Sequence, residues 1–332
     1  MKKIALITDA WLPQINGVVN TFLSIIPRIE KKYIVKVLHP GMFKNFSYPW
    51  YKEIKIAYNT KKITSSFFYS FNPDIVHILT EGPVGRAGIA FCNQHKWKYT
   101  TSFHTRFPEY IEKRIYVPRK LTYWYLRNFH KNADKVLVPT QSMINELSKY
   151  KFQNLNVWAR GVDTNLFAPS KRTRKDNEIN ITYVGRVAIE KNIKAFLELK
   201  TTMKKTVVGD GPELQKLKKK YPNVMFVGVK KGDELAQFYA NADVFVFPSK
   251  TDTFGNVILE ALASGTPVAA FPVVGPLDIM KNTEVDALDE NLGKSIEKAL
   301  KIKRGDCREF AMQFTWEQCS QDFISHMVMA KE

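Results

Sequence analysis

Two carboxylates in the second half of the chain stand at a spacing that could bind one extended polar ligand. Asp252 follows the apolar run 244–247, and Glu260 comes after seven intervening residues, inside a helix expected to begin after Gly255. A glycine at this turn lets the backbone approach a ligand closely, and free amides at a helix start can receive an anion. Carboxylates accept hydrogen bonds from paired sugar hydroxyls. The segment predicts a site for a ligand with an anionic part and a hydroxylated part; a helix cap beside an exposed glutamate is the alternative.

Two cations follow an earlier strand in the same half. The run 179–184 predicts a strand, and the loop after it carries Arg186 and Lys191. Arginine offers a planar fork to phosphate oxygens and lysine a compact point charge, so this pair could neutralise a departing diphosphate. Ordinary surface charges are the alternative. Gly209 and Gly211 lie in a further strand-to-helix turn, where they permit close backbone approach to a ligand or simply form a tight turn.

The first half of the chain places polar residues after its own strands. Gly17 precedes a helix whose first amides could contact a diphosphate or a sugar. His104 follows the run 99–103; a single histidine is more often structural, but at a strand end it is also a plausible partner for sugar hydroxyls. Glu81 follows the run 75–78 in the same layer and is a candidate contact for a second substrate.

Strand-like runs alternate with helical patterns along the chain, and these elements must position the residues above. One series of runs covers 4–7, 34–38, 75–78, 99–103 and 135–138, and a second covers 179–184, 206–208, 224–227, 244–247 and 267–270. Helical patterns cover 21–29, 143–150, 192–199, 213–221 and 233–239. This alternation predicts parallel sheets with right-handed crossovers. Since ligands bind beyond the carboxyl ends of such strands, we expect the chemistry in a cleft between two doubly wound α/β domains.

The segment 249–261 resembles the signature of the retaining, family-4 branch of the GT-B glycosyltransferases, which has an acidic residue, seven positions and then Glu. The resemblance implies that Glu260 holds the donor's ribose hydroxyls. It also implies that Asp252 holds the transferred sugar and diphosphate, together with backbone amides of Phe254, Gly255 and Asn256. The sequence departs from the commonest pattern, because its first acidic residue is Asp rather than Glu.

Other segments extend the resemblance over nearly the whole chain. It implies diphosphate roles for Arg186 and Lys191, a functional role for His104, and a nucleotide site bordered by Gly209 and Gly211. Gly17 resembles the family's glycine loop, although related enzymes often have two glycines there. The segments 104–110 and 274–278 are similar to bacterial enzymes that glycosylate diacylglycerol or similar lipids. The acceptor-binding candidates are Asn16, Glu81, Arg106 and Tyr110.

The fold class implied is α/β, with two Rossmann-like domains of parallel sheets facing across a cleft. The segment 168–178 is rich in Lys, Arg, Ser and Asp and is interpreted as an exposed linker. The predicted domains are therefore 1–168 on the acceptor side and 169–310 on the nucleotide-sugar side. The segment 311–332 is expected to form a helix that crosses back to the first domain, as is common in this fold.

Composition favours an anionic partner without choosing one. Lys and Arg number 50 against 32 Asp and Glu, which gives a formal charge of +18 in 332 residues. Nucleic acid, a membrane surface and phosphorylated small molecules all suit this surplus, and solvated surface lysines are the alternative. Three cysteines lie far apart without a CxxC pair, so we expect a reducing compartment and neither a disulfide framework nor a zinc site.

A basic, aromatic segment suggests where a membrane would be contacted. No run is long and apolar enough to span a bilayer, so we expect a cytoplasmic protein bound peripherally to the inner face of the cytoplasmic membrane. The segment 112–135 mixes Lys and Arg with Tyr, Trp and Phe, which suits an anionic membrane interface. A helix that packs these aromatics into the core is the equal alternative. Signatures of nucleic-acid readers are absent, so no nucleic-acid partner is expected.

The expected activity is transfer of a hexose or hexuronic acid, with retention, from a nucleotide sugar to a lipid such as diacylglycerol. A UDP-sugar is favoured; a GDP-mannose-dependent mannosyltransferase is the alternative, and an enzyme that hydrolyses or epimerises a nucleotide sugar is a further rival. No residue clearly claims the role of a nucleophile for double displacement, so front-face attack assisted by the leaving phosphate is expected. The cation pair makes a metal unnecessary, no Asp-x-Asp is visible, and no cofactor is expected.

Overall fold

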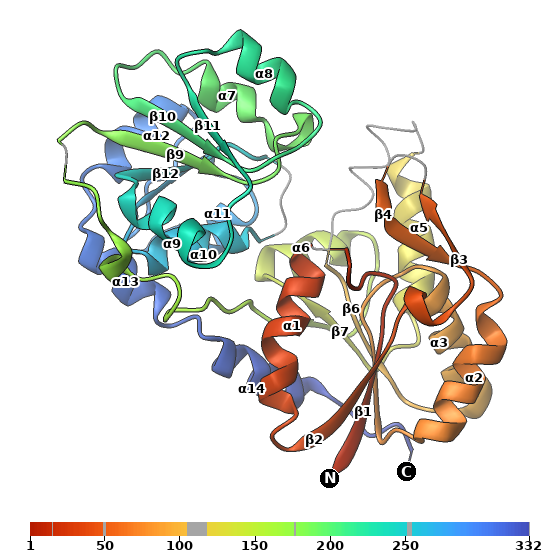
Figure 1. Ribbon diagram of the computed structural model, residues 1–332. Coiled ribbons are helices and arrows are strands. Elements are labelled where there is room, and N and C mark those ends of the chain that lie inside the picture. The colour runs from red at the N-terminus through yellow and green to blue at the C-terminus, as the bar shows by residue number, and fades with distance from the viewer. Residues whose placement is uncertain (15, 49–50, 105–117, 176, 251–253, 332) are drawn as a thin grey trace. The chain divides into compact units, whose positions relative to one another are not determined.

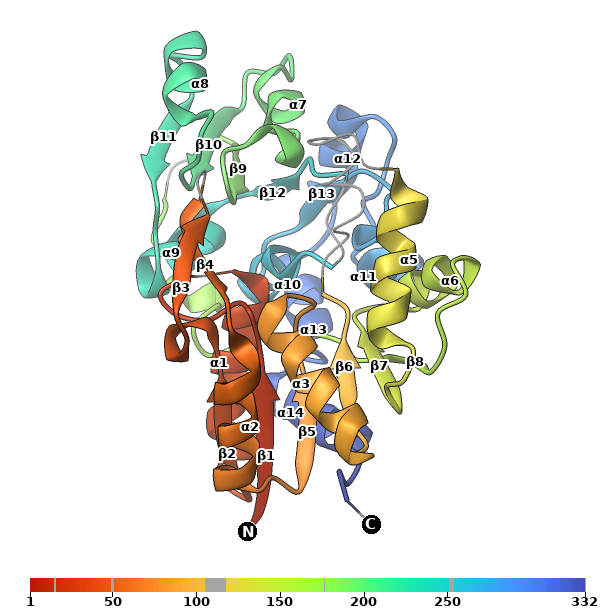
Figure 2. The same cartoon turned by 90° about the vertical axis from the view of Figure 1, so that its right-hand side faces the viewer.

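The computed structural model describes the chain except residues 15, 49–50, 105–117, 176, 251–253 and 332. It divides into two compact units. Unit 1 comprises Met1–Ala159 and Trp316–Glu332, and unit 2 comprises Arg160–Thr315. Each unit has a parallel sheet with helices on both faces (Figure 1, Figure 2). The prediction of two parallel-sheet α/β domains is confirmed.

The sheet of unit 1 has the strand order β2-β1-β5-β6-β7-β8, and every pairing is parallel. Its strands are β1 (Lys2–Ile7), β2 (Tyr33–Leu38), β5 (Ile75–Ile78), β6 (Thr100–Ser102), β7 (Lys135–Val138) and β8 (Leu155–Val157). Successive side chains of a strand point to opposite faces, so Ile4 and Leu6 enter one core cluster while Ala5 and Ile7 enter another. Burial on both faces explains why β1 is an unbroken apolar run.

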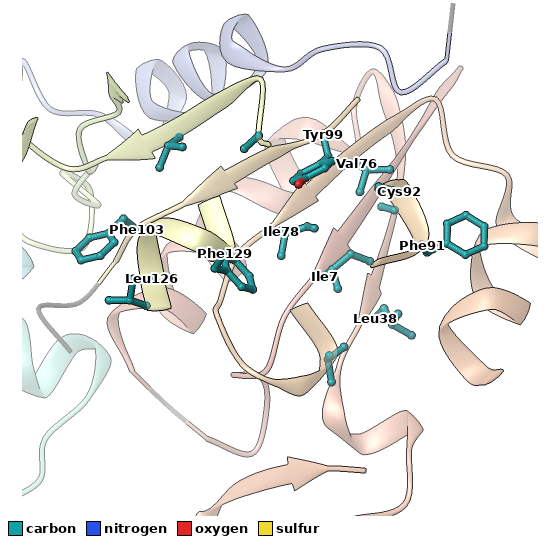
Figure 3. Close-up of a cluster of buried hydrophobic side chains, with 14 of the residues drawn as sticks. Ile7, Leu38, Val76, Ile78, Phe91, Cys92, Tyr99, Phe103, Leu126 and Phe129 are labelled. Carbon is teal, nitrogen blue, oxygen red and sulfur yellow. The ribbon is translucent and has the colours of Figure 1, made fainter. Parts of the chain in front are cut away.

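Helices cover the two faces of this sheet differently. On one face lie α2 (Thr60–Phe71), α3 (Pro83–His95), α5 (Arg119–His130) and α6 (Gln141–Lys149). Figure 3 shows this core, in which Phe129 of α5 and Phe91 of α3 pack in the same cluster as Ile7 and Ile78 of the strands. A short helix η1 (Pro40–Met42) and the antiparallel hairpin β3 (Asn45–Tyr48) and β4 (Tyr51–Ala57) precede α2. The sequence patterns predict neither the hairpin nor β8.

The other face is covered by the first and last helices of the chain. The helix α1 (Gly17–Ile29) lies against α14 (Trp316–His326), with the rings of Phe22 and Phe323 5.6 Å apart. The indole of Trp158 donates a hydrogen bond of 3.0 Å to the carbonyl of Cys319. The segment after Trp316 is therefore part of unit 1.

The sheet of unit 2 has the order β11-β10-β9-β12-β13, again all parallel. Its strands are β9 (Asn180–Val184), β10 (Lys204–Val208), β11 (Met225–Gly228), β12 (Val244–Phe247) and β13 (Val268–Ala270). One face carries α9 (Gly232–Asn241), α10 (Asn256–Ala263), α11 (Pro276–Met280) and α13 (Arg304–Ala311); the other carries α7 (Ile193–Leu197), α8 (Leu214–Lys220) and α12 (Leu292–Ala299). After β9, the chain adds β10 and β11 on one side of that strand and then β12 and β13 on the other side, so the strand order reverses between β9 and β12.

The chain passes between the units at residues 159–160 and 315–316, whereas the sequence places boundaries at 168 and 310. Val162 forms a parallel bridge with Thr315, and Arg308 donates a hydrogen bond of 2.8 Å to the carbonyl of Phe167. Both contacts hold residues 160–168 on unit 2.

The predicted linker 168–178 also lies on unit 2. It contains the short helix η2 (Pro169–Lys171), and the guanidinium groups of Arg172 and Arg174 lie 3.1 and 2.8 Å from the two oxygens of Asp243. These ion pairs fix the segment beside α9, so it is not a free linker. Within the described ranges, no helix combines the length and apolarity needed to cross a bilayer.

Candidate active site

Three loops of unit 2 leave neighbouring strands at the edge where the strand order reverses. They follow β9, β10 and β12, and β9 lies between the other two. In doubly wound sheets this edge binds ligands, because the helices on either side of the reversal splay apart. The side-chain amide of Asn192 donates a hydrogen bond of 3.0 Å to the carbonyl of Pro248, which ties the loop after β9 to the loop after β12. The structure therefore gathers the predicted cation loop, glycine turn and helix start at one edge.

The glycine turn after β10 is required by the packing of the protein itself. Gly209 has φ +137°, and a Cβ there would lie 1.9 Å from the carbonyl oxygen of Gly185. A Cβ on Gly211 would lie 2.4 Å from the carbonyl oxygen of Val187, whose amide donates to Asp210 at 2.9 Å. The sequence left both ligand approach and a plain tight turn open for these glycines, and the structure shows that the turn itself requires them. Their donor contact stays a prediction.

The cation loop begins on a fixed backbone. The hydroxyl of Tyr183 donates a hydrogen bond of 2.7 Å to the carbonyl of Arg186, whose side chain is exposed. Lys191 is half-buried and ends the short helix η3 (Ile189–Lys191). Both cations therefore project from one short, hydrogen-bonded loop at the end of the central strand. Such an arrangement can stabilise negative charge that develops on a leaving group.

The helix α10 begins at a glycine N-cap, so among the described residues no N-cap side chain accepts from its first amides. Its N-cap is Gly255, with φ +89°, a conformation that a residue with a side chain rarely adopts. Phe254 is buried in the core, so its contribution to a ligand site would come from its backbone, and Asn256 is half-buried. Asp252 lies outside the described residues. An uncapped helix start attracts anions, as expected for the diphosphate part of a donor.

Glu260 is held on one oxygen by a buried tyrosine. The hydroxyl of Tyr239, from α9, donates a hydrogen bond of 2.8 Å to Oε2 of Glu260. Burial raises the pKa of Glu260 to about 7, although this hydrogen bond acts in the opposite direction. Burial and the neighbouring carboxyl raise the pKa of Tyr239 well above its usual value, so the tyrosine stays a donor. In the described part of the chain Oε1 accepts no hydrogen bond, which leaves it for ligand hydroxyls.

Unit 1 has its own polar cluster where its strand order reverses, between β1 and β5. The carboxylate of Asp9 accepts hydrogen bonds from the amides of Val84 (2.7 Å) and Gly85 (3.1 Å) at the start of α3, and from Thr80 (3.1 Å). Burial raises the pKa of Asp9 to about 6. A Cβ on Gly82 would lie 2.4 Å from Cγ of Asp9, so only glycine fits there. Sequence reasoning missed this residue, although an acid directly after a buried strand is a usable signal.

Glu81 contacts a second residue that the sequence did not single out. Its Oε1 lies 3.4 Å from Nε2 of His130, whose side chain is 1% exposed. Nδ1 of His130 lies 2.8 Å from the hydroxyl of Thr101, and the hydroxyl of Tyr125 donates to the carbonyl of Glu81 at 2.9 Å. Glu81 is thus positioned by α5, and its predicted contact with an acceptor stays a prediction.

The remaining candidates of unit 1 are distributed around α1 and the end of β6. Asn16 caps α1, because its side-chain oxygen accepts from the amide of Val19 at 3.0 Å. A Cβ on Gly17 would meet nothing within 4 Å, so the protein itself does not require glycine there. The ring of His104 stands edge-on to Phe22 and Trp158 at centroid distances of 6.1 and 6.3 Å. Arg106 and Tyr110 lie outside the described residues, as does the 112–117 part of the basic aromatic segment.

The described part of that aromatic segment, helix α5, has two different faces. Tyr123 and Phe129 are buried, and Tyr123 stacks on Tyr150 with ring centroids 3.7 Å apart. Leu121 and Trp124 are each 55% exposed. The packing of aromatics into the core is confirmed for the buried side of α5, and membrane contact through its exposed side stays a prediction. Among the described residues no cluster of three or more His, Cys, Asp or Glu side chains could hold a metal ion.

Comparisons with known proteins identify the family. A model described as "Glycosyltransferase Family 4" matches residues 27–166, and one described as "Glycosyl transferases group 1" matches residues 178–313. The chain belongs to the group 1, family 4 glycosyltransferases. One relative is a GDP-mannose-dependent alpha-mannosyltransferase of Mycolicibacterium smegmatis, 26% identical over 98% of this chain and 96% of that protein. Another is an alpha-monoglucosyldiacylglycerol synthase of Streptococcus pneumoniae, 27% identical over 81% of this chain and 70% of that protein.

Solved structures support the fold of this glycosyltransferase. Sucrose-phosphate synthase from Thermosynechococcus elongatus superposes with a TM-score of 0.77 over 98% of both chains, at 19% identity. Such a distant likeness establishes the architecture and not the substrates. The predictions of a GT-B glycosyltransferase and of an enzyme are confirmed.

Proposed function

We propose that this glycosyltransferase transfers a hexose or hexuronic acid, with retention, from a nucleotide sugar to a lipid acceptor such as diacylglycerol. The observation that carries the proposal is that the loop with Arg186 and Lys191 and the start of α10 follow neighbouring strands, β9 and β12, at the reversal edge of unit 2. These groups suit a diphosphate. Glu260, on the same helix, suits the hydroxyls of a ribose.

The donor is bound by complementary chemistry along this edge. Amides at the start of α10 receive a phosphate, and the two cations of the β9 loop balance its charge. The free oxygen of Glu260 accepts a ribose hydroxyl, and the bond from Tyr239 holds the carboxyl group in place. Asp252 is the proposed contact for the transferred sugar.

Retention follows from attack on the same face that the diphosphate leaves. The acceptor hydroxyl oxygen bonds to the anomeric carbon, the bond from that carbon to the phosphate oxygen breaks, and the hydroxyl proton passes to the departing phosphate. Arg186 and Lys191 stabilise the charge on that phosphate, which is the main catalytic contribution and replaces a divalent metal. His104 is the proposed polar contact for the sugar.

A lipid acceptor is supported by α5 and by the relative that synthesises a glucosyldiacylglycerol. Trp124 and Leu121 lie three residues apart, on one exposed side of the helix, and the exposed cations Arg119 and Lys120 precede them. An apolar pair beside cations suits the headgroup region of an anionic membrane. We therefore propose peripheral binding to the cytoplasmic membrane face, with Asn16, Glu81, Arg106 and Tyr110 toward the acceptor.

The second candidate is a GDP-mannose-dependent mannosyltransferase. It is favoured by the relative from M. smegmatis, whose similarity spans 98% of this chain. The two candidates differ in the base and sugar of the donor, while the diphosphate and ribose contacts are common to both.

The first experiment is a thermal-shift screen of UDP-glucose, UDP-glucuronate and GDP-mannose on the whole chain. A ligand that binds only the folded state raises the melting temperature, so stabilisation by one nucleotide family identifies the donor class. The stabilising donor is then incubated with diacylglycerol, and the product's anomeric proton is assigned by NMR. An α-linked product from an α-linked donor is expected. A β-linked product would refute retention, and stabilisation by no nucleotide sugar would refute the donor site.

Membrane binding is tested by flotation with vesicles of phosphatidylcholine alone or with phosphatidylglycerol. The wild type should float with the anionic vesicles, and Trp124→Ala should float less. Tyr69→Ala, which removes another exposed aromatic of unit 1, is the matched control. Flotation that does not depend on anionic lipid, or on Trp124, would count against the proposed surface.

A further inference from the structure

A small pocket of unit 1 lies between the C-terminal end of α5 and the chain that leads from α6 to β8. Its volume is about 210 Å³, and it is lined by Arg127, Asn128, His130, Lys131, Lys151, Phe152 and Gln153. Figure 2 shows α5 beside α6, and the stacked rings of Tyr123 and Tyr150 join the two segments. No residue of the proposed donor site belongs to this pocket.

The lining carries positive charge and no carboxylate. Arg127, Lys131 and Lys151 form no ion pair with any residue that the structure describes. Like charges held close together repel one another, so such a cluster is stabilised by an anion that lies between them. The inner wall includes two buried side chains, those of His130 and Phe152.

The end of α5 explains only part of this charge. The C-terminus of a helix carries partial negative charge, which favours cations in its last turn, such as Arg127. Lys151 comes from a different segment, with φ +61°, and its amide donates to the carbonyl of Ser148. The helix end therefore does not account for the presence of Lys151 in the lining of the same pocket.

His130 provides a second sign of a ligand. Its side chain is 1% exposed, and its Nε2 makes no hydrogen bond with any described residue, although Oε1 of Glu81 lies 3.4 Å away. A buried ring nitrogen without a hydrogen bond is costly, and a ligand atom that pairs with it would offset that cost. The amides of Asn128 and Gln153 add neutral donors to the lining.

We propose that this pocket binds a phosphate group, separately from the diphosphate of the nucleotide sugar. A phosphate monoester carries about −1.5 to −2 charges near neutral pH and has three strong acceptor oxygens. Three cations and two amides therefore suit a phosphate ligand better than a ligand with a single carboxylate. The phosphate comes either from a small soluble ester or from the headgroup of an anionic lipid. In both cases it lies beside the pair of His130 and Glu81, on the unit to which acceptor binding is assigned.

The test measures binding of inorganic phosphate to the whole chain by thermal shift and by ³¹P line broadening, against potassium chloride at equal ionic strength. The wild type and Lys62→Gln, which removes an exposed lysine of α2 outside the pocket, should bind alike. Lys151→Gln should weaken binding roughly five- to tenfold, as expected for one charge-assisted contact at a partly exposed site. Lys151 is not on α5, so its effect is separate from the membrane surface proposed there.

A second arm uses phosphatidylcholine vesicles with and without phosphatidic acid. If Lys151→Gln weakens the binding of free phosphate, a soluble source is supported. If Lys151→Gln weakens only the binding of vesicles that contain phosphatidic acid, a lipid headgroup is supported. If Lys191→Gln abolishes phosphate binding and Lys151→Gln does not, the anion lies at the donor site and the proposal is overturned. The proposal is also overturned if phosphate and chloride have the same effect on the melting temperature and line width, and if Lys151→Gln binds both kinds of vesicle as the wild type does. Neither arm uses a sugar donor, so failure here leaves the proposed transfer reaction untouched.

Discussion

Replacing Glu260 by glutamine should remove the pH dependence of nucleotide-sugar binding. Burial raises the pKa of this carboxyl to about 7 in the free protein. Ribose hydroxyls donate hydrogen bonds to the ionised form, so binding should lower that pKa and release a proton. Glutamine keeps the size of the side chain and an oxygen that can accept from Tyr239, but it does not titrate.

The magnitude follows from the ionised fraction. A group with a pKa of about 7 is roughly 9% ionised at pH 6 and roughly 91% ionised at pH 8, so the dissociation constant should fall about tenfold between these values. Binding should release about 0.9 proton at pH 6 and about 0.1 at pH 8. The affinity of Glu260→Gln should be flat with pH, close to the wild type at pH 6 and about tenfold weaker at pH 8.

Isothermal titration calorimetry of the donor found in the screen measures both quantities, since buffers of different ionisation enthalpy report the protons released. A nucleotide sugar is preferable to a free nucleotide, because its diphosphate has no terminal phosphate that titrates in this range. Glu234→Gln, which neutralises an exposed carboxylate on α9, is the control and should keep the wild-type profile. A wild-type affinity that does not change between pH 6 and pH 8 would refute the reasoning, as would an identical slope in Glu260→Gln.

The same substitution has a consequence without ligand. Since the folded pKa of Glu260 lies above its usual 4.5, the folded protein binds more protons than the unfolded chain between those values. The free energy of unfolding should therefore fall as pH rises from about 4.5 to 7, by up to about 3 kcal/mol from this group, and level off above. Glu260→Gln should lack this decline in urea titrations.

Four further substitutions concern other residues. Gly209→Ala should destabilise unit 2 by about 2 kcal/mol or more, because its Cβ would overlap a carbonyl oxygen. Gly17→Ala should leave the melting temperature unchanged, since its Cβ meets no protein atom, and should lower activity if a ligand fills the space beside it. Lys191→Ala should lower kcat by about a hundredfold or more with an unchanged circular dichroism spectrum, and near-normal turnover would contradict its role. Asp9→Asn should remove a decline in unfolding free energy of up to about 3 kcal/mol as pH rises from its usual pKa of 3.8 to about 6, which urea titration at a series of pH values would detect.

Apolar runs made most of the fold predictable. Each run that the sequence marks as a strand overlaps a strand, and the runs 75–78 and 244–247 are buried along their whole length, where continuous Val, Ile and Phe are favoured. The hairpin β3–β4 lacks such a run, because it pairs only with itself and mixes polar residues with aromatics. The short β8 is an edge strand with no fully buried residue, so its sequence carries little signal.

Composition could not distinguish paired charge from solvated charge. The segment 168–178 has the residues of a linker, yet Arg172 and Arg174 are fixed on Asp243, about seventy positions away. The same limit applied to the site. Motifs located Arg186, Lys191 and Glu260, but the partners that set their chemistry come from other elements, as Tyr239 does for Glu260. Asp9 was missed because its burial depends on the amides of α3, and His130 because its pairing depends on Glu81.

The packing of α14 on α1 determines when unit 1 can be completed during synthesis. Phe22 and Trp158 bury their rings against Phe323, and the indole of Trp158 is bonded to Cys319. The ribosome synthesises Cys319 and Phe323 about 160 residues after Trp158, when the whole of unit 2 has already been made. A fragment that stops at residue 159 would display an apolar face in place of that helix, so a recombinant unit 1 needs α14 supplied through a short artificial connection or as a separate peptide.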